Sequence, residues 1–173
     1  MAIPSKDFYA AFGAITHWYA QVEFGVKATI GGILDLHIDD AQILTEPYSA
    51  ANLRNVATSI AKASALSATD QHALVSIVGD FGTFGRIRNF VAHSRWRAGS
   101  RPDSLKPLGM DIRSGTAKSL GWHDDERDYT ASELEAEASK LIAINKRLLD
   151  FHVQTGLGAR IAAKIEATRD STD

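Results

Sequence analysis

Apolar side chains recur every three or four positions along most of this chain, which is the spacing of one buried face of a helix. The first such stripe consists of Phe8, Phe12, Ile15, Tyr19, Val22, Val26, Ile30 and Ile33. Ser5 precedes the stripe and is a favourable N-cap, while Gly31 and Gly32 weaken its far end. The pattern therefore predicts a long first helix from Ser5 to the glycine pair.

Two more helices are predicted in the first half of the chain. One begins near Ser49, and its inward positions are Leu53, Val56, Ala57 and Ile60. Another opens at Ser67, where Ser67 and Asp70 have the spacing of a capping box. Its stripe consists of Leu74, Ile77, Val78, Phe81, Phe84 and Arg88, which predicts one continuous helix ending near Ser94.

The period then changes. Alternating Leu108, Met110 and Ile112, the turn signal Ser114-Gly115 and a return segment at 117–122 predict a short β-hairpin within about 105–129. A second capping box, Thr130 to Glu133, then starts a long helix. The stripe of this helix consists of Leu134, Ala138, Leu141, Ile144, Leu148 and Phe151, and Gly156 and Gly158 interrupt it before a last helical piece at 159–168.

These elements predict an all-α fold, an up-and-down helical bundle with a small β-hairpin insertion before the long C-terminal helix. The predicted domain covers residues 1–155, and residues 156–173 form a helical extension with a frayed tail. Hydrophobic residues make up 45% of the 173 residues, which argues against disorder.

Composition narrows the function classes. A net charge of −2 excludes a polycation that wraps nucleic acid through its whole surface. The absence of cysteine excludes disulfides and thiolate metal sites. We see no signal peptide and no apolar run of roughly 20 residues, so a soluble cytoplasmic protein without a membrane segment is expected.

Candidate chemistry concentrates in one basic segment, with no acidic residue from Phe81 to Pro102. Its candidate site residues are Arg86, Arg88, Asn89, His93, Arg95 and Arg97. On a helix, Asn89 and His93 are neighbours at i and i+4, and Arg86 lies two turns before His93 on the same face. Arg88 is displaced from His93 by roughly 140°, although its side chain is long. Spacing alone leaves open which arginine serves His93.

These residue types suit cleavage of RNA without a metal ion. That reaction needs a base for the 2′-hydroxyl, an acid for the leaving 5′-oxygen and a cation for the charge on phosphorus. Histidine transfers protons near neutrality, arginine grips phosphate through two donors, and the amide of asparagine orients either group. One histidine cannot readily be both acid and base, and two copies across a dimer solve this. The structural alternative is a basic helix end favoured by the helix dipole.

The segment Arg88-Asn89-Phe90-Val91-Ala92-His93 resembles the Arg-polar-x-x-x-His motif of the HEPN superfamily. The resemblance implies an all-α bundle, often a homodimer, and Arg88 and His93 match the catalytic pair of the family. Many such domains are metal-independent endoribonucleases of toxin–antitoxin and defence systems, so RNA and an antitoxin are the implied partners. Others are catalytically silent modules that bind a nucleotide or a protein, which is the alternative function.

Other candidates are weaker. Glu23 is either a surface acid or a buried acid facing the motif, where it would contact substrate. Trp18 and Trp96 are expected to pack rather than to stack on bases. The segments His37–Asp40 and His123–Glu126 are interpreted as a helix cap and a solvated loop, so no metal and no cofactor is expected. The glycines Gly79, Gly82 and Gly85 suggest close helix packing, with a dimer contact as one option.

Overall fold

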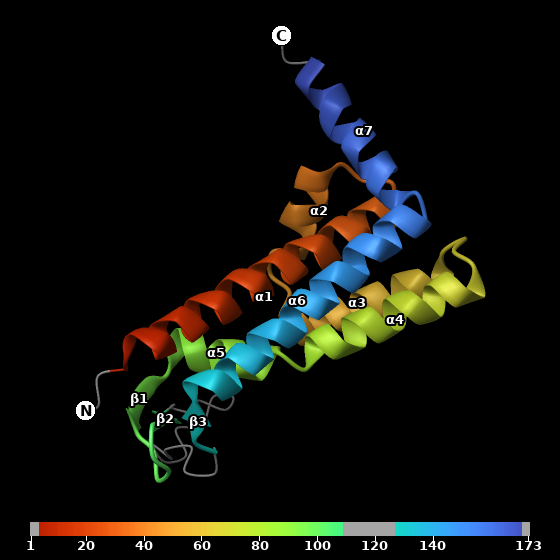
Figure 1. The fold of residues 1–173 in the computed structure, drawn as a ribbon. Helices are drawn as coiled ribbons and strands as arrows, with labels where there is room; N and C mark the ends of the chain where they lie inside the picture. The colour runs from red at the N-terminus through yellow and green to blue at the C-terminus, as the bar shows by residue number, and fades with distance from the viewer. Residues whose placement is uncertain (1–3, 109–126, 171–173) are drawn as a thin grey trace, which may run out of the picture. The chain divides into compact units, whose positions relative to one another are not determined.

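The protein is mostly α-helical, with a small antiparallel sheet ahead of the long helix α6, in a computed structural model that describes residues 4–108 and 127–170 (Figure 1). The helices are α1 (Lys6–Ile33), α2 (Ile38–Thr45), α3 (Ala50–Ala63), α4 (Ala68–Gly82), α5 (Gly85–His93), α6 (Ala131–Gln154) and α7 (Leu157–Asp170). The strands are β1 (Arg95–Ala98), β2 (Ser104–Leu108) and β3 (Tyr129–Thr130). This architecture confirms the predicted mostly-α fold with a small β insertion.

The chain divides into two compact units. The first comprises Met1–Trp18 and Arg86–Lys140, and the second comprises Tyr19–Gly85 and Leu141–Asp173. Helices α1 and α6 contribute one end to each unit. The candidate motif therefore belongs to the first unit.

The predicted stripes are the buried faces of the long helices. Ile15, Val22 and Val26 of α1 are fully buried, and so are Leu134 and Leu141 of α6. Burying a leucine or valine side chain stabilises a fold by about 1.5–3 kcal/mol relative to exposure. The same positions that set the helical period thus form the cores of the two units.

Side-chain caps begin α3, α4 and α6, and the caps of α4 and α6 are the two predicted boxes. At α6 the box is reciprocal, because Thr130 N donates to Glu133 Oε2 (2.8 Å) and Glu133 N donates to Thr130 Oγ1 (3.2 Å). Ser67 Oγ accepts from Asp70 N (3.1 Å) at the start of α4, and Ser49 is the N-cap of α3. Each cap satisfies a backbone N–H that the first helical turn leaves without a partner.

The third predicted helix is not continuous. It ends at Gly82, and a separate helix α5 begins at Gly85. Thr83 closes α4, since its backbone N–H and its hydroxyl both donate to Asp80 O. Gly82 lies so close to α3 that an added Cβ would be 2.8 Å from Arg54 Cδ. Of the three spaced glycines, Gly82 and Gly85 lie against α3, whereas an added Cβ at Gly79 would meet no atom within 4 Å. The apolar period masked the break because Phe84 stays buried.

The predicted hairpin is only partly within the described residues. Its turn Ser114-Gly115 and its return segment at 117–122 lie outside them. The hairpin that is described pairs β1 with β2, with Trp96 opposite Pro107 and Arg97 opposite Lys106, and β3 pairs with the far side of β2. Strand β1 was not predicted, because its four residues are too short for a period to show.

The second unit carries polar groups inside its core. Lys27 is buried, and its Nζ lies 2.9 Å from Glu46 Oε2 and 3.6 Å from Glu23 Oε1. Thr29 Oγ1 donates to Gly25 O and lies 2.7 Å from His152 Nε2, while burial lowers the pKa of His152. Each of these buried groups has a partner, as low-dielectric surroundings require.

Two smaller sequence predictions concern a helix cap and membrane-spanning helices. His37 is the N-cap of α2, as the interpretation of His37–Asp40 as a helix cap requires. Within residues 4–108 and 127–170, no helix combines the length and the apolar character needed to cross a membrane.

Candidate functional site

The candidate motif lies on α5, a helix of nine residues with one buried side. Phe90 is buried, whereas Asn89 and His93 are exposed. His93 is the last residue of α5, so its imidazole stands at a helix end beside strand β1. The motif therefore presents its polar side chains to solvent rather than to the core.

The structure brings Arg88 to both other motif residues. Arg88 Nη1 donates to Asn89 Oδ1 at 3.2 Å and lies 3.5 Å from His93 Nε2, which is the long end of a hydrogen bond. When Arg88 donates, Nε2 accepts, and the ring proton of a neutral His93 is then on Nδ1. The guanidinium, the amide and the imidazole form one exposed cluster, called here the Arg88 cluster.

Arg86 takes a different position. Its Cζ lies 5.5 Å from the centroid of the Phe90 ring, in the geometry of a cation–π contact. Because Arg86 and Phe90 are four residues apart, the helix places one above the other. Of the two arginines left open by spacing, Arg88 is the one that the structure brings to His93.

Strand β1 extends the basic character beyond the helix. Arg95 and Arg97 are exposed, while Trp96 between them is buried and packs against Phe12, with 4.8 Å between ring centroids. This is the alternation of a strand with one covered face. Trp96 is thus a core residue of the first unit, as expected.

Sequence reasoning missed Lys106. It lies directly opposite Arg97 in the β1–β2 register, so the two side chains share one face of the sheet, where Arg97 is exposed and Lys106 half-buried. The pairing of β1 with β2 joins residues that are distant in sequence, so the sequence does not show it. The alternation of Arg95, Trp96 and Arg97 was the one sign that a strand lies there. We call Arg95, Arg97 and Lys106 the basic strand face.

A buried carboxylate holds the connection between β1 and β2. Asp128 Oδ2 accepts hydrogen bonds from Ser100 Oγ (2.6 Å), from Ser100 N and from Arg101 N (3.2 Å). These bonds, led by the Ser100 hydroxyl, lower the pKa of Asp128. An added Cβ at Gly99 would lie 2.7 Å from Asp128 Oδ2, so the chain needs glycine there.

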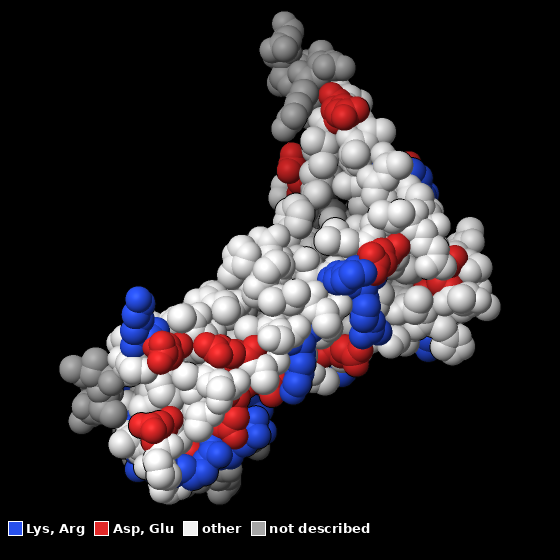
Figure 2. All heavy atoms as spheres, in the orientation of Figure 1, with Lys and Arg blue, Asp and Glu red and all other residues white. Residues whose placement is uncertain are grey.

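Two arginines near the sheet are already paired with acids. Arg101 Nη2 lies 2.7 Å from Glu133 Oε2, and Arg127 Nη2 lies 3.7 Å from Glu137 Oε1. Figure 2 shows blue and red side chains next to each other in the region where Figure 1 draws the sheet. Pairing reduces the charge that these two arginines can offer to a phosphate.

Glu133 carries a testable electrostatic contribution. The hydrogen bond from Arg101, and then that from Thr130 N, lower the pKa of Glu133 from 4.5 to about 2. A carboxyl group whose pKa is lowered by folding stabilises the fold at pH values above its pKa in the unfolded chain. This stability is lost as the pH falls from about 5 towards 2. We expect Glu133→Gln to remove about 1 kcal/mol from the free energy of unfolding at pH 7, after allowance for solvent screening, and little at pH 2.

Urea unfolding of both proteins at several pH values measures this difference. Glutamine keeps an oxygen for Thr130 N, so the comparison isolates the charge. Glu135→Gln, on the exposed side of α6, is the matched control and should leave the acid profile of the native protein unchanged. A Glu133→Gln variant that follows the native protein at every pH would contradict the ion pair's role.

The remaining candidates have other described partners or lie outside the described residues. Glu23 belongs to the second unit, where its carboxylate contacts Lys27. Trp18 makes an edge contact with the ring of His17, with 5.1 Å between centroids. The segment His123–Glu126 lies outside the described residues, and the residues within them include no group of three His, Cys, Asp or Glu placed to hold a metal ion.

Comparisons of the chain with protein-family models, with curated proteins and with solved structures found no match. The functional argument therefore depends on the chemistry of the side chains. An exposed imidazole beside a guanidinium can take or give a proton at the position where the guanidinium binds an anion. The Arg88 cluster thus has the parts for proton transfer next to a phosphate.

Proposed function

We propose that this chain is a metal-independent endoribonuclease of the HEPN type. The observation that carries the proposal is the Arg88 cluster, in which His93 is exposed and its Nε2 lies 3.5 Å from Arg88 Nη1. A structural role for His93 would predict a buried or capped imidazole, and a binding module has no need of a proton-transfer group beside its cation. The proposal includes the biological role that the HEPN resemblance implies, a cytoplasmic toxin or defence protein held by an antitoxin.

The chemistry uses the RNA's own nucleophile. The 2′-oxygen forms a bond to phosphorus as its proton passes to a base, and the 5′-oxygen leaves with a proton from an acid. The products are a 2′,3′-cyclic phosphate and a 5′-hydroxyl. Arg88 stabilises the negative charge that grows on the phosphate oxygens, and Asn89 holds Arg88 by accepting one of its N–H groups.

One His93 supplies one of the two proton transfers. A second copy of the chain would bring a second His93, so the proposal includes a homodimer with two motifs facing one cleft. A closed two-fold dimer would place the same patch of both chains in contact.

The basic strand face is proposed to guide the RNA backbone. Arg95 and Arg97 lie two and four positions after His93 in the chain, and Lys106 lies opposite Arg97. Together with Arg86 these side chains would line the path of the phosphates. DNA has no 2′-hydroxyl and should resist cleavage even where it binds.

The decisive experiment incubates the purified protein with a mixed RNA pool in EDTA and analyses the new ends. We expect cleavage with 2′,3′-cyclic phosphate and 5′-hydroxyl ends, and none of single-stranded DNA of the same sequences. Loss of activity in EDTA with recovery on adding a divalent ion would refute the mechanism, as would equal cleavage of DNA. No cleavage of any RNA would favour the silent module that binds a nucleotide or a protein.

Loss of the basic strand face should weaken RNA binding rather than chemistry. We expect Arg97→Ala and Lys106→Ala each to make the negative slope of log K against log salt concentration shallower by about 0.7. A variant with one phosphate contact fewer releases fewer counterions when it binds a single strand. Filter binding to a non-cleavable RNA at several salt concentrations measures this slope. Lys146→Ala on α6 is the control of equal charge change, and a matching decrease there would show a general charge effect.

A further inference from the structure

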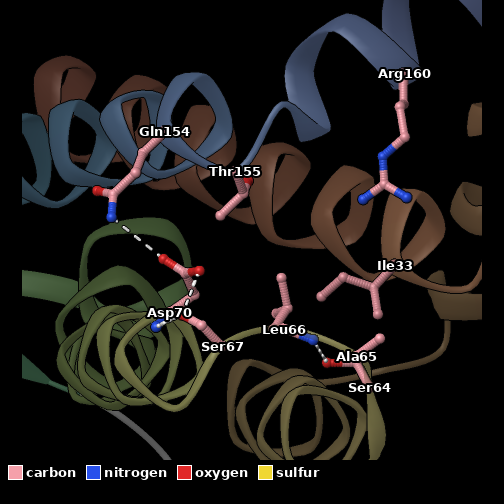
Figure 3. Close-up of a pocket in the computed structure, with 9 residues that line it drawn as sticks. All are labelled: Ile33, Ser64, Ala65, Leu66, Ser67, Asp70, Gln154, Thr155 and Arg160. Carbon is pink, nitrogen blue, oxygen red and sulfur yellow. Dashed lines mark hydrogen bonds between the residues drawn. The ribbon is translucent and has the colours of Figure 1, made fainter.

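The second unit contains a pocket of about 430 Å³ between helix ends (Figure 3). Its walls include Ile33 at the end of α1, the α3–α4 connection with Leu66, the start of α4 with Asp70, Gln154 of α6 and Arg160 of α7. Small-molecule sites in proteins have volumes of about 300–1,000 Å³. The pocket is therefore large enough for a metabolite-sized ligand.

Arg160 makes one side of the pocket cationic. Its guanidinium extends from α7 towards Ile33 (Figure 3). The nearby acid Asp35 is held by Lys164, with Nζ 2.8 Å from Oδ1, and the pKa of Asp35 is lowered first by Lys164 and only to a smaller extent by Arg160. Because Asp35 forms its ion pair with Lys164, the guanidinium of Arg160 can bind an added anion through two N–H groups.

Packing fixes the backbone that carries Arg160. Leu157 of α7 is fully buried, and an added Cβ at Gly32 of α1 would lie 2.9 Å from Leu157 Cδ1. The left-handed residue Gly156, with φ of 68°, turns the chain from α6 into α7. The cation thus stands on an anchored helix rather than on a loose tail.

The opposite side of the pocket offers hydrogen-bond acceptors and donors. Gln154 Nε2 donates to Asp70 Oδ1 at 3.2 Å, and Ser67 Oγ donates to Asp70 Oδ2 at 2.6 Å. Each carboxylate oxygen can accept a second bond, and the Gln154 amide keeps one N–H and its oxygen. A carboxylate beside an amide is well suited to bind a pair of hydroxyl groups.

Between these two sides the wall is apolar and preformed. Ile33 and Leu66 supply carbon surface, and the Leu66 backbone is held at both ends. Its N–H lies 3.4 Å from Ser64 Oγ, and its carbonyl accepts from Gln71 Nε2 at 3.0 Å. A preformed wall lowers the entropic cost of binding.

We propose that this pocket binds a small hydroxylated organic phosphate, of the sugar phosphate class. The phosphate binds the Arg160 guanidinium, the carbon skeleton lies against Ile33 and Leu66, and the hydroxyls bond to Asp70 and Gln154. This binding function is separate from RNA cleavage, because none of these residues belongs to the Arg88 cluster.

Calorimetric titration of the full chain with ribose 5-phosphate tests the proposal, with inorganic phosphate and ribose as parallel ligands. We expect saturable binding of ribose 5-phosphate with Kd of about 0.1–1 mM, and at least about tenfold weaker binding of each fragment. Arg160→Ala should weaken ribose 5-phosphate about tenfold. Gln154→Ala should weaken it about threefold while leaving inorganic phosphate unaffected.

Lys146→Ala, an equal loss of charge on the exposed side of α6, is the control and should leave the affinity unchanged. Circular dichroism of each variant verifies that it is folded. The proposal is overturned by no saturable binding, by equal affinity for inorganic phosphate and ribose 5-phosphate, or by an Arg160→Ala variant that binds as the native protein does. An equal loss in Lys146→Ala would also overturn it, since binding would then follow net charge.

Discussion

His93→Ala is expected to lower the rate of RNA cleavage by about 10²–10⁴-fold, which is the contribution of a positioned proton-transfer group. The side chain is exposed and its contact within the described residues is the long one to Arg88, so the free energy of unfolding should change by less than about 0.5 kcal/mol. Single-turnover cleavage of a labelled RNA and urea unfolding measure the two effects.

His72→Ala is the matched control, because His72 is also exposed on a helix but lies in the second unit. It should keep full activity. Unfolding of the His93→Ala protein would instead show that His93 is structural. Normal cleavage by a folded His93→Ala protein would remove the Arg88 cluster from the mechanism.

Arg88→Ala is expected to lower the rate constant of cleavage by about 10²–10³-fold, with a smaller change in KM, because the guanidinium stabilises charge that grows only in the transition state. Arg88→Lys should recover part of this loss, since it restores a cation without the planar two-donor fork. The difference between the two variants separates charge from geometry.

Arg86→Ala discriminates between the two arginines. Arg86 stands over Phe90, so its loss should weaken RNA binding by less than about tenfold and leave the rate at saturating RNA nearly unchanged. A larger loss of rate for Arg86→Ala than for Arg88→Ala would reverse the assignment.

Mixing native and His93→Ala chains tests the proposed homodimer. If one cleft needs a His93 from each chain, a mixed dimer lacks one of its two proton-transfer groups, so after subunit exchange the activity should fall with the square of the native fraction. Activity that falls only in proportion to the native fraction, together with light scattering that shows only monomers, would contradict the shared cleft.

Local patterns in the sequence predicted most of the helical structure. The apolar stripe with Ile15 and Val22 repeats every three or four residues, and the capping boxes at Ser67 and Thr130 span four residues. Such local patterns can be recognised in the sequence without the tertiary structure. The motif's residue types and the end of its helix at His93 were predictable for the same reason.

Tertiary contacts decided what local patterns could not. Gly82 at the end of α4 lies against the side chain of Arg54, which is 28 positions earlier in the chain. The basic strand face depends on the register that sets Lys106 opposite Arg97, and that register is held by Asp128 across the sheet. These contacts join residues far apart in sequence, so they cannot be predicted from the helical or strand periodicity of apolar residues.

The choice between Arg86 and Arg88 shows the same division within one helix. The sequence placed both near His93, and helix spacing left open which of them serves it. The buried ring of Phe90 gives Arg86 a partner one turn away, while Arg88 reaches Asn89 and His93 at the helix end. The sequence alone thus determined the helices and the candidate chemistry, and packing decided which side chains meet, because side-chain position follows from what the neighbouring surface leaves open.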